Sequence, residues 1–256
     1  MKYTPYKKRV LITGGTKGIG RAVVEEFSRL GANVFTCARN AEELAALLEE
    51  CKSKNWNVQG VVADVAESEG RLSLVAAVSA AFDHQLDVLI NNVGTNVRKK
   101  TTEFTDQDAE HLNRTNLLSA FCLTRDCHAL LKKTGDACVL FNSSVAGGPT
   151  AMKSGSLYAL SKASLNQLAK NLTCEWAHEG IRVISVAPWY TATPLAMQVL
   201  SDRSYEAEVL SRTPMRRVAE PVEVARVMAF LASPAASYVT GATIPVDGGY
   251  SCMGLF

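Results

Sequence analysis

The sequence predicts an α/β protein built on one doubly wound parallel sheet with helices on both faces. Short, continuous apolar runs alternate along the chain with segments of helical periodicity. Because strands of continuous apolar character are covered on both faces, this alternation is typical of parallel sheets. The 256 residues, 47% of them hydrophobic, are enough for one large domain with a sizeable core. We therefore expect residues 1–256 to form a single domain.

Each expected element follows from a local pattern. The run 10–13 (VLIT) is apolar enough for a buried strand. In the helix expected after it, Ile19, Val23 and Phe27 share one face, and Gly31 ends the helix. Strands are expected at 10–13, 33–38, 58–63, 87–91, 137–142, 181–187 and 242–246. Helices are expected at 18–30, 41–54, 68–82, 106–132, 156–178 and 220–232.

The segment 189–215 breaks this rhythm. It follows the carboxyl end of the strand at 181–187, and ligands of open α/β sheets bind at such ends. We expect it to form a substrate lid over a pocket.

Charge and cysteine content exclude several classes of protein. The formal net charge of +2 lacks the basic excess of a nucleic-acid-binding protein. Seven cysteines without a CxxC pair argue against a disulfide framework or a zinc site, and favour free thiols in a reducing compartment. No apolar run resembles a signal peptide or a membrane span. The protein is expected to be cytoplasmic, with no nucleic-acid, membrane or metal partner.

A glycine-rich loop joins the first expected strand to the first helix. Residues 13–20 read TGGTKGIG, with glycines in the spacing GxxxGxG. Such a loop lets backbone approach a pyrophosphate, which the N–H groups and the positive dipole end of the helix then bind. In this strand–loop–helix context the motif predicts a Rossmann-type dinucleotide site.

The choice of dinucleotide depends on Arg39, at the end of the second expected strand. NAD-specific proteins commonly place an acid near this position for the ribose hydroxyls. An arginine instead offers a fork for a 2′-phosphate, and Lys17 in the glycine loop can add a second positive charge. Two cations and no acid predict NADP(H).

Tyr158 and Lys162 are four residues apart at the start of an expected helix, so they share a face. An ammonium beside a phenol is expected to lower its pKa toward the range useful for proton transfer. Ser143 and Ser144 follow a strand end and could hydrogen-bond the same substrate oxygen. Asn116 lies within the preceding long helix.

Together these motifs resemble the short-chain dehydrogenase/reductase family, and the resemblance covers essentially the whole chain. Within the family, the chain is similar to the plant tropinone reductase and tropinone-reductase-like group in VFTCARN (34–40), LAKNLTCEWAHEGIRV (168–183) and FLASPAASYVTGATIPVDGG (230–249). The family motifs are TGGTKGIG at 13–20, NNVG at 91–94, Asn116, SS at 143–144, YALSK at 158–162 and VDGG at 246–249.

The resemblance implies a role for each position. Tyr158 would exchange a proton with the substrate oxygen, which Ser144 would hydrogen-bond. Lys162 would hold the nicotinamide ribose and lower the tyrosine pKa, and Asn116 would hold a water that relays protons. The residues implied in cofactor binding are Gly14, Thr16, Lys17, Gly18, Ile19, Gly20, Arg39, Asp64, Val65, Asn91, Gly94, Tyr158, Lys162, Pro188, Thr191 and Thr193. The expected substrate contacts are Ser144, Tyr158, Trp189, Tyr190 and Met197.

Three departures from the family pattern bear on substrate fit. Trp189 stands where many members have glycine after Pro188, and Val93 stands where the common motif has alanine. Ser144 and Tyr158 are fourteen residues apart, one more than the commonest spacing.

The leading hypothesis is NADPH-dependent reduction of a small lipophilic ketone or aldehyde by a homodimer or homotetramer. The alternative is a 3-oxoacyl-acyl-carrier-protein reductase, for which Arg98, Lys99 and Lys100 could form a basic patch. A sugar or steroid dehydrogenase working in the oxidative direction is a further reading. A cofactor-sensing protein without catalysis is disfavoured because the catalytic set is intact.

Overall fold

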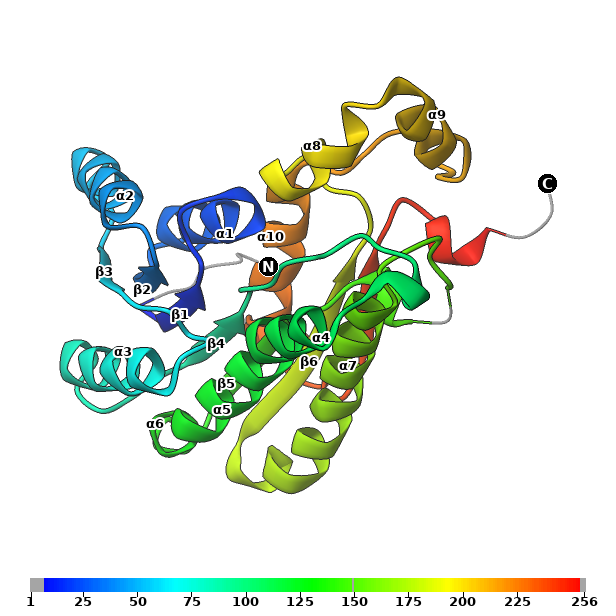
Figure 1. Ribbon diagram of the computed structural model, residues 1–256. Helices are drawn as coiled ribbons and strands as arrows, with labels where there is room; N and C mark the ends of the chain where they lie inside the picture. Colours follow the sequence, from blue (N-terminus) through cyan, green and yellow to red (C-terminus); the bar gives the residue numbers. More distant parts are fainter. Residues whose placement is uncertain (1–6, 149, 254–256) are drawn as a thin grey trace.

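The computed structural model describes residues 7–148 and 150–253, in which seven parallel strands form one sheet (Figure 1). The strand order is β3-β2-β1-β4-β5-β6-β7. All seven expected strands are confirmed, with each end within one residue of its predicted position. The strands are β1 (Arg9–Thr13), β2 (Asn33–Ala38), β3 (Val58–Val62), β4 (Val88–Asn91), β5 (Ala137–Asn142), β6 (Ile181–Pro188) and β7 (Thr243–Val246).

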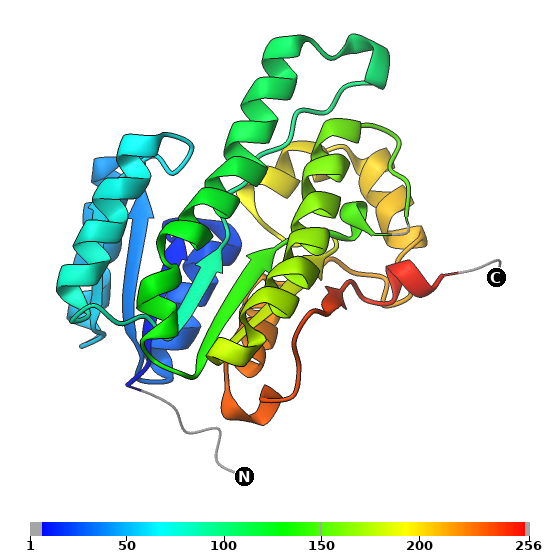
Figure 2. The same ribbon diagram turned by 90° about the horizontal axis from the view of Figure 1, so that it is seen from below.

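Helices cover both faces of the sheet, as Figure 2 shows along with Figure 1. The described helices of one face are α1 (Gly18–Arg29), α2 (Ala41–Ser53) and α10 (Pro221–Leu231), whose buried residues share one apolar cluster. The opposite face carries α3 (Ser68–Ala81), α5 (Ser119–Asp126), α6 (His128–Lys132) and α7 (Ser156–Trp176). The expected doubly wound architecture is therefore confirmed.

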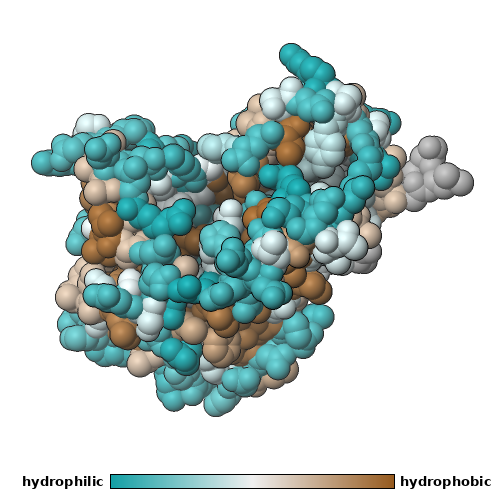
Figure 3. All heavy atoms as spheres, viewed as in Figure 1, coloured by the Kyte–Doolittle hydropathy of each residue, from teal (hydrophilic) through white to brown (hydrophobic). Residues whose placement is uncertain are grey.

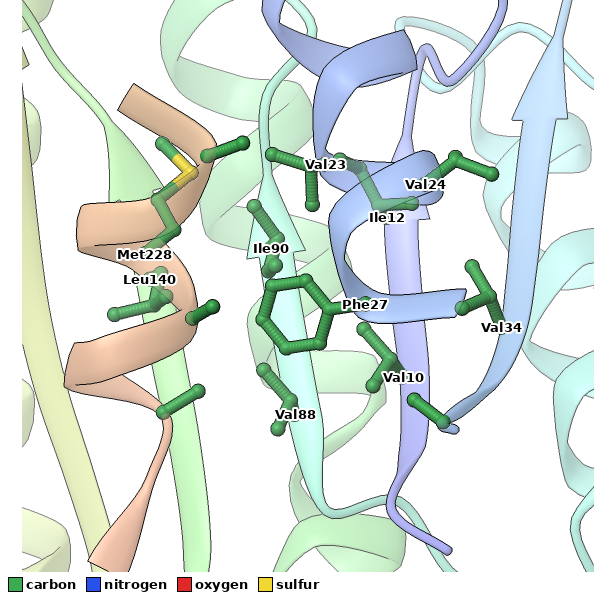
Figure 4. Close-up of a cluster of buried hydrophobic side chains, with 14 of the residues drawn as sticks. Val10, Ile12, Val23, Val24, Phe27, Val34, Val88, Ile90, Leu140 and Met228 are labelled. Atoms are coloured by element: carbon green, nitrogen blue, oxygen red, sulfur yellow. The ribbon is translucent and has the colours of Figure 1, made fainter. Parts of the chain in front are cut away.

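The two faces of the sheet are assigned by alternation along each strand. In β1, Val10 and Ile12 pack against α1, whereas Leu11 points to the opposite cluster. Figure 4 shows Phe27 of α1 over β1 and β4, with Met228 of α10 beside it. Complete burial of one such side chain contributes about 1.5–3 kcal/mol. These contacts hold the glycine loop's helix firmly on the sheet.

The prediction of one continuous helix at 106–132 is wrong. The chain forms α4 (Asp106–Leu112), then a π-helical stretch (Asn113–Leu118), then α5, and it breaks at Cys127 before α6. Hydrophobic periodicity does not predict a π-helical turn. Such a turn changes which side chains face the sheet, and it is frequent at functional sites. Here the π-stretch carries Asn116, which is fully buried.

The topological switch point lies between β1 and β4, because the strand order proceeds from β1 to β3 toward one edge of the sheet and from β4 to β7 toward the other. The carboxyl ends of β1 and β4 therefore open a crevice in which ligands of such sheets bind. Beyond β6, the segment 189–215 folds into α8 (Pro194–Leu200) and α9 (Arg203–Ser211), which lie above this end of the sheet in Figure 1. No described helix combines the length and apolar character needed to cross a membrane.

Candidate active site

The glycine loop follows β1 and leaves no room for side chains. A Cβ on Gly20 would lie 2.1 Å from the carbonyl oxygen of Gly14, and one on Gly18 would lie 3.1 Å from Thr193. Gly14 and Gly18 also have positive φ, which glycine adopts without steric cost. The N-cap of α1, Lys17, forms no side-chain cap, and its first turn holds no acid. The loop is thus a cradle of backbone beside open helix N–H groups, which fits a dinucleotide pyrophosphate.

Two cations flank this cradle, and each has an acidic partner that the sequence did not indicate. Lys17 Nζ lies 2.5 Å from Glu43 Oε1 on α2. The Arg39 side chain is 75% exposed, and its Nη1 lies 3.8 Å from Asp64 Oδ2. The distance to Asp64 is too long for a strong ion pair, so the guanidinium is available to an anion. To bind a phosphate, the Lys17 ammonium would have to leave its ion pair with Glu43.

Tyr158 and Lys162 lie in the first turns of α7, which begins after Gly155 in the left-handed conformation. Lys162 is buried; its Nζ donates to the carbonyl oxygen of Asn142 at 2.7 Å and lies 5.6 Å from the centroid of the Tyr158 ring. The predicted shared helix face is confirmed by this geometry. Gly94 comes close to the same ammonium, because a Cβ there would lie 3.2 Å from Nζ.

The pKa of Tyr158 is raised, contrary to the expectation that Lys162 lowers it. Burial is the main cause, and the hydrogen bond with Ser144 and the charge of Arg98 oppose it. The ammonium of Lys162 points to a backbone carbonyl rather than to the phenol oxygen. Burial also lowers the pKa of Lys162 to about 8. A raised tyrosine pKa keeps the phenol protonated at neutral pH, which is the form that donates a proton.

Asn116 is held by both ends of its amide. Its Oδ1 accepts from the backbone N–H of Thr95 at 2.8 Å, and its Nδ2 donates to the carbonyl oxygen of Thr95 and to Ser161 Oγ. The π-stretch directs it to the loop after β4, next to α7. A Cβ on Gly94 would lie 3.5 Å from Asn116 Oδ1 and 3.2 Å from Lys162 Nζ, so Asn116 lies near Lys162, although its amide group bonds to protein partners.

The two serines after β5 have different surroundings. Ser143 donates to the carbonyl oxygen of Lys162 at 3.0 Å, which ties β5 to α7. Ser144 accepts from the N–H of Ala146, lines the cavity with Tyr158, and lowers the pKa of Tyr158 against the effect of burial. Only Ser144 is therefore positioned beside the phenol, and Ser143 has a structural contact.

A cavity of about 160 Å³ lies over these groups. Trp189 and Tyr190 both line it, but each side chain is held from behind. The Trp189 ring stacks on Tyr250 with centroids 3.6 Å apart, and its indole N–H donates to Thr213. Tyr190 shares a 2.8 Å hydrogen bond with Tyr205 of α9. The predicted residues Ile19, Gly94, Ser144, Tyr158, Lys162, Pro188, Trp189, Tyr190, Thr191 and Thr193 all line this cavity.

The predicted site residues that do not line this cavity are Gly14, Thr16, Lys17, Gly18, Gly20, Arg39, Asp64, Val65, Asn91, Asn116 and Met197. Two of them, Asn91 and Met197, were expected to line the cofactor cleft and to contact the substrate, respectively. The side chain of Asn91 donates to Thr124 in the core, and Asn92 lines the cavity instead. Asn92 also donates to the carbonyl oxygens of Thr13 and Gly14, so it joins β4 to the glycine loop. Strand alternation could have indicated this exchange. Met197 is 49% exposed on α8 and is absent from the lining.

The remaining lining was missed by the sequence-based reasoning. Successive residues of a helix start or an irregular loop point in different directions, so spacing alone does not predict which of them face a cavity. The unpredicted lining residues are Asn92, Asn96, Asn142, Ala146, Met152, Ser154, Leu195 and Ala196. Ser143 and Arg98, which the sequence analysis did consider, also line the cavity.

A glycine cradle at the switch point, next to a Ser–Tyr–Lys cluster in one cavity, defines a dinucleotide-dependent oxidoreductase. The family model described as "Enoyl-(Acyl carrier protein) reductase" matches residues 14–251. The chain belongs to this family of short-chain dehydrogenases/reductases, and it is an oxidoreductase.

Relatives and solved structures agree with this assignment. A tropinone reductase homolog of Arabidopsis thaliana is 49% identical over 96% of this chain and 93% of its own length. Senescence-associated protein 13 of the same plant is 46% identical, over 95% and 90%. A gluconate 5-dehydrogenase from Burkholderia cenocepacia, solved with NADP and tartrate, superposes with a TM-score of 0.94 at 28% identity, over 99% of this chain and 98% of its own. A putative gluconate 5-dehydrogenase from Beutenbergia cavernae, with bound NADP, gives 0.93 and 29%, over 99% and 100%.

Proposed function

We propose that the protein reduces a small lipophilic ketone or aldehyde to an alcohol with NADPH, within one domain spanning residues 1–256. The observation that carries this proposal is that Ser144, Tyr158 and Lys162 line one cavity. A carbonyl oxygen between the two hydroxyl groups would accept a hydrogen bond from each. Ser144 would orient this oxygen, and Tyr158 would transfer its proton to it.

NADP(H) supplies the hydride when it is bound, and the chain's own residues hold and orient it. The glycine loop would bind its pyrophosphate, while Arg39 and Lys17 would bind the 2′-phosphate. Lys162 would bind the ribose next to the nicotinamide and restore the proton of Tyr158. Further residues proposed on the cofactor side are Thr16, Ile19, Asp64, Val65, Gly94, Pro188, Thr191 and Thr193. Asn92 replaces Asn91 in this set.

Cavity shape supports a small substrate. Met152, Leu195, Trp189 and Tyr190 contribute apolar surface to its lining. We propose that the segment 189–215 acts as a lid, because a hydrogen bond between the hydroxyl groups of Tyr190 and Tyr205 connects the cavity wall to α9. Lys153, between the lining residues Met152 and Ser154, also forms an ion pair with Glu208 of α9.

A substrate panel tests the proposed activity. We expect NADPH oxidation with cyclic ketones and aryl aldehydes, at kcat/KM values at least about ten times those with a 3-oxoacyl thioester. NADPH oxidation is followed by absorbance, with the Tyr158→Phe variant as the blank. If thioesters on an acyl carrier protein are the preferred substrates, the 3-oxoacyl reductase is the correct function instead.

The basic patch that this alternative requires has little support. Arg98 lines the cavity, and Lys99 Nζ lies 2.6 Å from Asp108 Oδ2. Lys100 is exposed at the start of a 3-10 turn. The three cations therefore do not present one surface to an acidic carrier.

We propose that the chain forms a homodimer or homotetramer through α5 and α7. Phe121 is 42% exposed, and Leu118 and Leu160 are also exposed on this side, where Figure 3 shows hydrophobic atoms among polar ones. Such patches mark protein interfaces. Light scattering should give a multiple of the chain mass, and Phe121→Asp should lower it. Leu72→Asp, at a 61% exposed site on α3, should leave the mass unchanged. A wild-type monomer would contradict the proposal.

We also propose a cytoplasmic location. All seven cysteines are free thiols, which a reducing compartment preserves.

A further inference from the structure

Arg98 is a cation in the wall of the catalytic cavity that neither the cofactor nor the proton transfer uses. It belongs to the segment after β4, it is partly buried, and it lines the same cavity as Ser144 and Tyr158. Its Nη2 donates to the carbonyl oxygen of Leu195, at the start of α8, with a separation of 3.3 Å. This contact holds the guanidinium across the cavity, between the β4 loop and α8.

The guanidinium has no carboxylate partner. Among the described residues no ion pair involves Arg98, and no Asp or Glu lines the cavity. One of its five N–H donors is used on Leu195, so most remain available. Withdrawing a cation from water is costly unless an anion or hydrogen bonds compensate. A ligand that brings its own anion would supply that compensation.

The charged side chains that line the cavity are all positive. Arg98 and Lys162 are its only charged lining residues in the described chain, and both are basic. The charge of Arg98 also acts on the two phenols of the cavity, since it lowers the pKa of Tyr158 and of Tyr190 against the effect of burial. A cationic amine would meet repulsion from both basic groups. An anion would be attracted.

We propose that Arg98 binds a carboxylate of the substrate, so that the preferred substrates are oxo acids whose ketone reaches Tyr158 and whose hydrocarbon portion lies on the apolar wall. This inference rests on the proposed carbonyl reduction and names its substrate class. A planar guanidinium matches a carboxylate with two parallel hydrogen bonds. Asn96 also lines this cavity, and its buried Oδ1 has no partner among the described residues.

The test compares each oxo acid with its own methyl ester, which keeps the ketone but removes the charge. The probes are 4-oxopentanoate and 5-oxohexanoate with NADPH. We expect wild-type kcat/KM to be at least about ten times higher for the acids than for the esters. Arg98→Gln should lower kcat/KM for the acids by about 10- to 100-fold, the range of a charged hydrogen bond, mainly through KM. It should leave the esters within about threefold.

Matched variants separate binding from misfolding. Arg98→Lys keeps the charge and should retain part of the preference for acids. Lys100→Gln removes an exposed charge two residues from Arg98 and should leave kcat/KM unchanged for both the acids and the esters. Equal rates for acids and esters in the wild type would overturn the inference, as would an equal loss for both in Arg98→Gln. If neutral ketones are reduced without a preference for acids, only this inference fails; if no carbonyl compound is reduced, the proposed function fails.

Discussion

Replacement of Tyr158 by phenylalanine is expected to lower kcat by about 10²- to 10⁴-fold, the usual contribution of general acid catalysis. The substitution removes only the hydroxyl group of Tyr158, which lines the cavity with Ser144, so the ring should keep its packing. NADPH binding should persist. It can be measured in the same sample by quenching of tryptophan fluorescence, because Trp189 lines the cavity.

Tyr238 provides the matched control. Its side chain is fully exposed, so Tyr238→Phe removes the same atom without touching the cavity. Turnover should then equal that of the wild type. Unchanged turnover in Tyr158→Phe would refute the proton-donor role. A loss of NADPH quenching together with activity would show that the variant had lost its cofactor site instead.

Replacement of Arg39 by aspartate is expected to raise KM for NADPH by about 10²-fold relative to KM for NADH. The guanidinium contributes a charge-assisted bond to the 2′-phosphate, whereas an aspartate repels it. NADH lacks this phosphate and should lose little. The exposed position of Arg39, with only a 3.8 Å approach to Asp64, makes a general loss of stability small.

An exposed arginine away from the loop controls for the change in net charge. Arg226 lies on α10, 4.0 Å from Glu26, and Arg226→Asp should change neither KM. Michaelis constants for both cofactors are measured at constant ionic strength, because exposed charges are screened by salt. Equal effects of Arg39→Asp on NADPH and NADH would rule out recognition of the phosphate by this residue.

Much of the site could be read from local sequence because its parts are local motifs. Tyr158 and Lys162 share a face through helical spacing alone. The glycine spacing between β1 and α1 likewise implies a tight backbone cradle, which the 2.1 Å approach of a Gly20 Cβ to Gly14 bears out. The parallel strands could be predicted in the same way, since continuous apolar runs indicate strands that are buried on both faces.

Other features required contacts between distant segments. The partner of the Asn91 side chain is Thr124, which lies 33 residues away on α5, and no local pattern identifies it. Lys162 points to Asn142 rather than to the phenol because β5 and α7 pack together. Burial then dominates the pKa of Tyr158. A charge pattern in the sequence carries no information on burial, which explains the wrong sign of that expectation.

Periodicity and short spacing encode backbone geometry within single elements, and so the doubly wound sheet, the dinucleotide cradle and the Tyr158–Lys162 pair could be predicted from the amino-acid sequence. The folded chain was needed to show that Arg98 lines the catalytic cavity whereas Lys99 pairs with Asp108. Adjacent residues of a loop have no fixed period. Their directions are set by the elements that pack around them, here α4 and α8, and so the charge of the substrate pocket emerges only in the folded chain.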